Sequence, residues 1–245
     1  MLNPKKGSFY RQLPFFVLKF FSGESMQSVK VAMESFYNML QFLLPGLGVT
    51  ISVTVIALFM GCFIGAAMAV LRVYGGVAAR SVAIFYSIVV RAIPVVVIIF
   101  ILYFVISEFI DLSPFMSGAV ALGFASGAYQ TEIFRGAILS VPRGQMVAAR
   151  GIGMSRGKAI RCIIMPQALR VAIPSLINEV SLVLKDSSLV FVIGVPELLR
   201  RAQYASASTM KPLLAFGCAA LFYILMTLIL SKVLESIEKK FAISF

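Results

Sequence analysis

The sequence predicts an all-α polytopic membrane protein with about five transmembrane helices. Of its 245 residues, 60% are hydrophobic and only 13% are charged, whereas soluble proteins carry about 25% charged residues. The apolar residues form long continuous runs, unlike the alternating pattern of a transmembrane β-barrel. A core of this size could not bury so much apolar surface, so lipid must solvate part of it.

The first transmembrane span is predicted over residues 46–71 and stops before Arg72. Residues 1–45 are interpreted as an N-terminal tail followed by an interfacial helix. In this interpretation the uncharged stretch 35–44 forms the helix. The Pro45-Gly46 pair separates it from the span, because proline interrupts a helix interior.

The second and third spans are predicted over residues 81–107 and 114–134. Arg91 and Pro94 interrupt the second span, and Arg91 lies near enough to one interface for its side chain to reach the lipid headgroups. The third span has a clear start. Ser113 is a favourable N-cap for a helix with proline at its first position.

Two further spans are predicted over residues 171–193 and 213–232, which completes a membrane domain of residues 46–234. Residues 235–245 would then form a short C-terminal tail. Between the third and fourth spans lies a basic, glycine-broken segment, residues 142–166. We expect this segment to form two short helices joined by a turn.

Turn and cap residues divide the basic segment into these two helices. Pro142 suits the first turn of a helix, whereas Gly151 and Gly153 favour a helix end. Ser155 is a suitable N-cap for the second helix, which Pro166 is expected to terminate. The turn contains small residues, so another protein could approach its backbone closely. Its glycine spacing differs from that of a P-loop, and no nucleotide site is predicted.

The distribution of Lys and Arg predicts the orientation. Five spans place the termini on opposite sides of the membrane. The loops 72–81 and 135–170 and the tail from Lys232 together carry twelve basic residues, against four on the other side. Basic loops face the cytoplasm, so the basic segment and the C-terminus are predicted inside and the N-terminus outside. The basic N-terminal tail does not fit this rule.

The remaining composition excludes several classes of function. The net charge of +12 is interpreted as loop charges facing lipid headgroups, so no nucleic-acid partner is predicted. The chain has no histidine and three scattered cysteines, which leaves no metal-ligand spacing. No nucleophile has a suitable base, so neither a catalytic residue nor an enzyme activity is predicted.

Within the basic segment, one pattern of residues closely resembles the EAA loop of ABC-importer permeases. The family pattern is Glu-Ala-Ala, three residues, Gly, nine residues, Ile, one residue, Leu-Pro, and the spacing here matches throughout. The residues that carry it are Val147, Ala148, Ala149, Gly153, Ile163, Met165 and Pro166. Val147 replaces the usual Glu, and Met165 replaces Leu. The segments "VVRAIPVVV", "SGAYQTEIFRGAILSVPRGQ" and "LVLKDSSLVFVIGVPELLRRAQ" also resemble the polar-amino-acid branch of this family.

This resemblance implies a type I permease fold in a bacterial inner membrane and a role in ATP-driven import of polar amino acids, of the histidine, glutamine or arginine type. It implies a second permease subunit, identical or homologous, that completes the path. Two copies of a cytosolic ABC ATPase would dock on the EAA loops and carry the ATP and Mg, so this chain needs no cofactor. An extracytoplasmic binding protein would deliver the amino acid.

Polar residues within the predicted spans are candidates for the substrate pathway, because ionisable groups are costly in a membrane. These candidates are Arg91, Glu132, Asn178, Glu179, Lys185, Asp186, Ser187 and Ser188.

Each candidate also has a structural interpretation. Glu132 could pair with Arg135 one helical turn away, and Arg91 could simply reach the interface. Asn178 and Glu179 could form hydrogen bonds between helices, and residues 185–188 could mark the outer end of a span.

Two other functions stay open at this point. One is a permease of the same architecture for another small solute. The other is an ATP-independent channel or secondary carrier.

Overall fold

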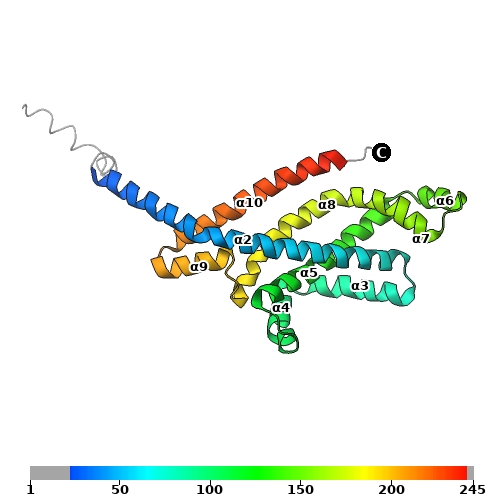
Figure 1. Cartoon of the computed structure of the whole chain (residues 1–245), viewed down its shortest axis with the longest axis horizontal. Helices are drawn as coiled ribbons and strands as arrows, with labels where there is room; N and C mark the ends of the chain where they lie inside the picture. The colour runs from blue at the N-terminus through cyan, green and yellow to red at the C-terminus, as the bar shows by residue number, and fades with distance from the viewer. Residues whose placement is uncertain (1–22, 242–245) are drawn as a thin grey trace, which may run out of the picture.

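The computed structural model describes residues 23–241, and every element in that range is helical. Figure 1 shows an elongated molecule in which α2 runs along much of the long axis. In chain order the elements are α2 (Gly23–Tyr74), α3 (Val77–Ala92), α4 (Val95–Phe100), η2 (Ile101–Val105), η3 (Ile106–Glu108), α5 (Pro114–Ser140), α6 (Arg143–Gly151), α7 (Arg156–Ala159), η4 (Ile160–Ile164), α8 (Met165–Asp186), η5 (Ser187–Ile193), α9 (Leu198–Thr209) and α10 (Pro212–Phe241). Of the short elements, η2 and η4 are π-helical, whereas η3 and η5 are 3-10 helices.

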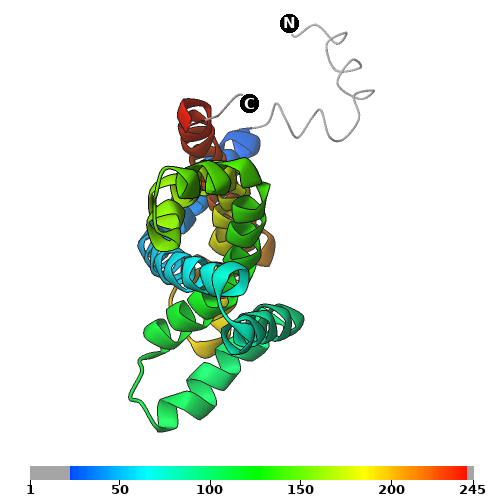
Figure 2. The ribbon, with the colours of Figure 1, turned by 90° about the vertical axis from the view of Figure 1, so that its right-hand side faces the viewer.

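The connections between helices gather at two ends of the molecule. Helices α6 and α7 lie at one end with the connection between α2 and α3, and α9 lies near the opposite end beside α2 (Figure 1). Figure 2 looks onto the end formed by α6 and α7. Helix α10 starts near α9 and runs back toward that end. The loops predicted to share the cytoplasmic side therefore lie toward one end of the fold.

Helix α5 is the central element and packs against α2, α3, α4 and α8. Its contact with α2 is close because glycines line it. A Cβ on Gly123 would lie 3.2 Å from the carbonyl oxygen of Ala57, and one on Gly65 would lie 3.0 Å from the backbone of Gln130. Larger side chains there would push the two helices apart. The main hydrophobic core lies along this contact.

The membrane crossings are only partly visible in helix length and composition. Among the described residues, the candidates are Met26–Tyr74 of α2, Pro212–Ser236 of α10 and, counted as one span, the bent pair Val77–Ala92 with Val95–Glu108. The other two predicted spans, which correspond to α5 and α8, do not combine the length and the apolar composition that a membrane crossing needs. Both bury polar side chains against the protein, such as Gln130 in α5 and Glu179 in α8. Helices covered by their neighbours need less apolar surface than helices that face lipid.

The predicted helix break at Pro45 and Gly46 is wrong, because α2 continues through both residues. The Arg201 guanidinium of α9 donates to the carbonyl oxygen of Phe42 at 3.0 Å, in the turn where proline lacks its N–H. A Cβ on Gly46 would lie 2.9 Å from the backbone of Leu198. The Pro-Gly pair therefore marks the place where α9 packs closely on α2.

The ends of the chain also differ from the prediction. Residues 23–45 form the first part of α2, while residues 1–22 of the predicted tail lie outside the described residues. With 52 residues, α2 is about 78 Å long, far longer than the roughly 30 Å hydrocarbon core of a bilayer. At the other end, α10 continues to Phe241, so most of the predicted tail 235–245 is helical.

The predicted second span, residues 81–107, is sharply bent. Helix α3 ends at Ala92, and the chain turns by 105° before the next helix. Pro94 directly precedes α4. At the start of a helix the backbone N–H has no partner within the helix, so the missing N–H of proline costs no hydrogen bond.

The prediction that Pro166 ends the second helix of the basic segment is also wrong. The helix runs without a break from Arg156 through η4 into α8. The wider π-helical turn lies directly before Pro166 and accommodates the proline. The Gln167 side chain donates to the carbonyl oxygen of Ile163 at 3.0 Å, which gives this carbonyl of the π-helical turn a hydrogen-bond partner.

Candidate functional site

The basic segment forms the predicted pair of helices joined by a turn, which we call the elbow (Arg143–Ala159, from α6 to α7). Helix α6 ends as the N–H of Ile152 donates to the carbonyl oxygen of Ala148 at 3.2 Å. Gly153 then takes φ +83°, a backbone conformation that favours glycine. Ser155 caps α7 and accepts from the N–H of Lys158 at 3.3 Å, so the predicted cap is confirmed.

The residues of the EAA-like pattern divide into an exposed group and a packed group. Val147 is 70% exposed, and Ala148 and Gly153 are also exposed. Ala149 is buried at 4% exposure. Ile163 and Met165 are half-buried and pack on a core formed by the ends of α2, α5 and α8, while Pro166 at the start of α8 is exposed. Only the exposed group can contact a partner directly.

The surface of the elbow is basic with an apolar tip. Between Glu132 and Glu179 the sequence contains seven Lys or Arg residues and no Asp or Glu. Next to these charges, Val147 and Ile152 are 70% and 80% exposed. Such exposed aliphatic side chains among charges are typical of a contact surface.

Glu132 is the centre of an ion cluster that links three helices. Its carboxylate pairs with Arg72 of α2, with Arg135 Nε at 2.9 Å and with Arg91 of α3 at 3.6 Å. Arg72 also donates to the Ser87 hydroxyl at 2.7 Å. The predicted pair of Glu132 and Arg135 is therefore present within a larger cluster. One carboxylate faces three guanidinium groups, which leaves the cluster net positive.

Glu179 lies in a second polar group at the contact of α5 and α8. Its side chain is 5% exposed and accepts a hydrogen bond from the Ser126 hydroxyl at 2.7 Å, while Gln130 donates to that hydroxyl at 3.0 Å. None of the ion pairs among the described residues includes Glu179. A cavity of about 220 Å³ opens beside it, lined by Leu58, Phe59, Cys62, Gln130, Leu176, Glu179 and Val180.

The other predicted pathway residues do not join this group. Asn178 is exposed, on another side of α8 from Glu179. At the end of α8, the Ser187 hydroxyl donates to the carbonyl oxygen of Leu184, and that of Ser188 to the carbonyl oxygen of Lys185, both at 2.7 Å. There the α-helix becomes the 3-10 helix η5, next to Asp186. The candidates thus lie at separate levels of the fold.

A third polar group surrounds Glu197, which is not among the residues predicted from the sequence. Glu197 is fully buried and caps α9 by accepting from the N–H groups of Leu199 and Arg200 at 2.8 and 2.6 Å. The Tyr223 hydroxyl of α10 donates to the same carboxylate at 3.0 Å. The sequence signal was a glutamate one residue before an amphipathic stretch, where an acidic N-cap is favourable.

Comparison with known proteins identifies the family and the fold. Residues 57–242 match the family described as the binding-protein-dependent transport system inner membrane component. The chain belongs to this family. The permease is 38% identical over 204 residues to the glutamine transport system permease protein GlnP of Escherichia coli (strain K12), covering 82% of this chain and 93% of the relative. It is also 38% identical over 217 residues to the octopine transport system permease protein OccQ of Rhizobium radiobacter, with 83% and 90% covered.

Solved structures agree with the family assignment. The permease superimposes on a chain of an amino acid ABC transporter solved with histidines, with a TM-score of 0.75, 31% identity, and 88% of this chain and 97% of the other covered. A chain of the inward-facing MetNI methionine ABC transporter gives a TM-score of 0.73 at 15% identity, with 84% and 99% covered. The type I importer permease fold predicted from the sequence is therefore confirmed, and the permease is a transport subunit located in a membrane.

Proposed function

We propose that the permease is the membrane-spanning subunit of an ATP-driven importer of polar amino acids. Its similarity to permeases named for glutamine and octopine transport carries this proposal. The permease completes its path with a second permease subunit, identical or homologous. An extracytoplasmic binding protein delivers the amino acid, and two cytosolic ABC ATPases hold the ATP and Mg that drive transport.

The elbow is proposed as the docking site of the ATPase. Its exposed residues Val147, Ala148 and Gly153 present a small-residue surface, and Ile152 adds a second aliphatic contact beside Val147. The continuous helix from Arg156 into α8 supports this role, because a rigid helix can carry a displacement of the elbow into the membrane. Val147 replaces the usual Glu, so the ATPase surface facing it should be apolar, with acidic groups opposite the surrounding arginines.

The substrate pathway is proposed to pass the cavity beside Glu179. The carboxylate has one hydrogen-bond donor, Ser126, and a substrate ammonium group could supply the positive charge that it lacks. Lys185 lies further along α8 and is exposed, where it could meet the carboxylate of the amino acid. The Glu132 cluster then holds α2, α3 and α5 together beside the path.

The orientation is proposed from charge and from the grouping of loops. The elbow and the C-terminus face the cytoplasm and the N-terminus faces outside, because the basic loops gather toward one end of the fold. The membrane is the inner membrane of a bacterium.

Uptake by reconstituted protein tests the proposed function. The permease would be incorporated in proteoliposomes with its cognate ATPase and binding protein, and uptake of labelled glutamine, arginine and histidine would be measured with and without ATP. We expect ATP-dependent uptake of at least one of these. Uptake by the permease alone would favour a channel or secondary carrier. ATP-dependent uptake of another solute only would change the substrate class.

A further inference from the structure

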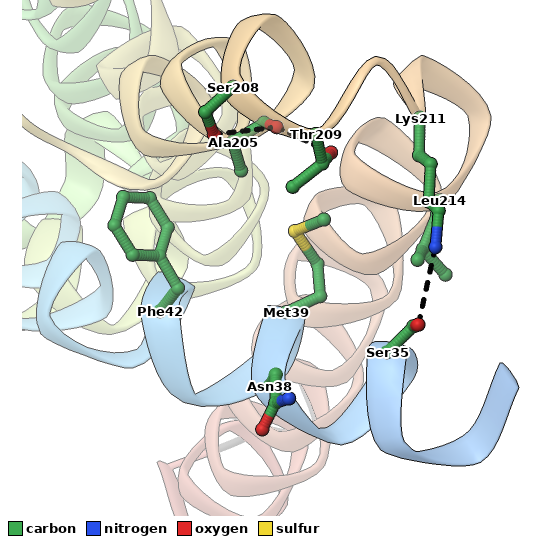
Figure 3. Close-up of a pocket in the computed structure, with 9 residues that line it drawn as sticks. All are labelled: Ser35, Asn38, Met39, Phe42, Ala205, Ser208, Thr209, Lys211 and Leu214. Carbon is green, nitrogen blue, oxygen red and sulfur yellow. Dashed lines mark hydrogen bonds between the residues drawn. The ribbon is translucent and has the colours of Figure 1, made fainter. Parts of the chain in front are cut away.

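A groove at the α9 end of the permease has no role in the proposed transport path. It lies between the first part of α2, the end of α9 and the start of α10 (Figure 3). The deeper part has a volume of about 280 Å³ and is lined by Ser35, Asn38, Met39, Phe42, Ala205, Ser208, Thr209, Lys211 and Leu214. A second hollow of about 550 Å³ shares Ser35, Lys211 and Leu214 and continues along α2 as far as Gln27.

Both parts of the groove are lined by polar and apolar side chains. Its outer part begins at Gln27, and Lys211 lies where the two hollows meet. Its deeper part is walled by Met39, which is 5% exposed, and by Phe42, which is 44% exposed. From Ser35, which contacts Lys211, to Phe42 the groove spans about 10 Å along α2, which is the length of part of an acyl chain.

Lys211 provides the single charge of this lining. It directly precedes Pro212, the first residue of the apolar helix Pro212–Ser236, so its ammonium lies where a membrane span meets the headgroup region. Figure 3 shows the side chain reaching toward α2, where it donates to the Ser35 hydroxyl at 3.3 Å. No carboxylate of the described residues forms an ion pair with it. Because an ammonium has three donors, further ones remain for an anion.

The opposite wall offers no hydroxyl donor to a polar ligand. Ser208 and Thr209 both donate to the carbonyl oxygen of Ala205, at 3.2 and 2.7 Å. Polar recognition in the deeper part is therefore left to Lys211, Ser35 and Asn38, while Met39, Phe42 and Leu214 offer apolar contacts to a chain.

We propose that this groove binds a glycerophospholipid. Its phosphodiester contacts Lys211 and Ser35, and one acyl chain lies along Met39, Phe42 and Leu214. The arrangement fits an amphiphile that already surrounds the protein, with the charge at the headgroup level and the apolar wall below it. An anionic headgroup is favoured because no carboxylate neutralises Lys211. The inference does not depend on which solute the permease transports.

Native mass spectrometry of the assembled transporter tests this inference. Delipidated permease with its ATPase would be titrated with phosphatidylglycerol. We expect Lys211→Met to weaken retention of one phosphatidylglycerol about fivefold, the effect of one interfacial charge. The matched control is Arg200→Met, which removes a half-buried cation of α9 that is bonded to Tyr204 and Gln203 and lies outside the groove. Equal retention by the Lys211 variant and the wild type would overturn the proposal.

Further experiments distinguish a bound lipid from a soluble phosphate or a protein in the groove. Ser208→Trp fills the groove from an exposed position of α9 without changing charge, and it should also reduce the bound phosphatidylglycerol. If water-soluble glycerol phosphate displaced the lipid at equal concentration, the acyl-chain contact would be refuted. A photoreactive residue at Ser208 should cross-link to lipid in the membrane. Cross-linking to another protein subunit instead would show that a protein covers the groove.

Discussion

At the scale of single residues, three carboxylates of the described part of the permease form hydrogen bonds or ion pairs, each with different partners. Glu132 faces three guanidinium groups, Glu197 accepts from two backbone N–H groups and a tyrosine, and Glu179 accepts from one serine hydroxyl. The first two have their hydrogen-bonding needs met within the chain. Of these three, Glu179 has the fewest partners, and it lies beside a cavity, which is why we favour it for substrate contact.

Replacing Glu179 by Gln tests that contact. The amide can still accept from Ser126, so the fold should be kept while the negative charge is lost. We expect uptake of a cationic or zwitterionic amino acid to fall roughly tenfold to a hundredfold, the loss of a hydrogen bond to a charged group. Uptake in proteoliposomes measures it. Asn178→Ala, at the exposed neighbouring position, is the control, and equal activity of both variants would argue against the pathway.

Replacing Glu132 by Gln has a different expected result. It leaves Arg72, Arg91 and Arg135 without their shared counter-charge, so the three guanidinium groups repel one another. We expect a loss of about 1–3 kcal/mol in stability, seen as a lower melting temperature in detergent. The control is Glu108→Gln, which removes an exposed carboxylate without an ion pair among the described residues. Equal melting temperatures would show that the cluster adds no stability.

At the scale of elements, the sequence predicted the long helices and the caps but not the effect of tertiary packing on proline. Ser113 caps α5 as expected and accepts from the N–H of Met116 at 3.3 Å. Pro45 and Pro166 were expected to end helices, yet both lie within continuous helical segments. In one case α9 donates to a carbonyl in the proline turn, and in the other a π-helical turn relieves the constraint. Arg201 lies far from Pro45 in the sequence, so local rules could not predict that contact, and they do not anticipate a π-helical turn before Pro166.

In the candidate site, too, the sequence predicted local structure but not the contacts that tertiary packing creates. The glycines and the Ser155 cap predicted the turn of the elbow correctly, but burial decides which of its residues face outward. Ala149 is buried, so Ala149→Glu would disturb the packing of α6 as well as any docking. Ala148 is exposed and is the better position for a test. The partners of Glu179 come from α5, more than 40 residues earlier, and no sequence pattern indicated that pairing.

Helix α9 depends on its buried cap. Glu197→Ala removes the buried acceptor of two backbone N–H groups and of the Tyr223 hydroxyl. We expect a loss of about 1–3 kcal/mol concentrated in α9 and seen as faster hydrogen exchange over residues 198–209. Unchanged exchange there would show that packing on Gly46 alone holds this helix. Glu235→Ala, at an exposed position of α10, serves as the control.

At the scale of the whole molecule, the fold separates the elbow from the α9 end. In a cysteine-free background, a single cysteine replacing Ile152 and another replacing Lys211 report the two ends. In right-side-out vesicles we expect a membrane-impermeant thiol reagent to label position 211 directly and position 152 only after permeabilisation. The background is needed because Cys62 and Cys162 are exposed. The opposite labelling would invert the proposed orientation and place the elbow away from any cytosolic ATPase.

The binding of the ATPase to the elbow is the most direct test of the account. Purified permease would be mixed with its cognate ATPase, and the affinity of the two proteins compared for the wild type, Ala148→Trp and Gly76→Trp. Both changes add the same side chain at exposed positions near the same end, and a side chain at Gly76 meets open space. We predict that Ala148→Trp weakens ATPase binding at least tenfold and abolishes uptake, while Gly76→Trp behaves as the wild type. Full ATPase binding and uptake by Ala148→Trp would contradict the proposal that the elbow couples the ATPase to transport.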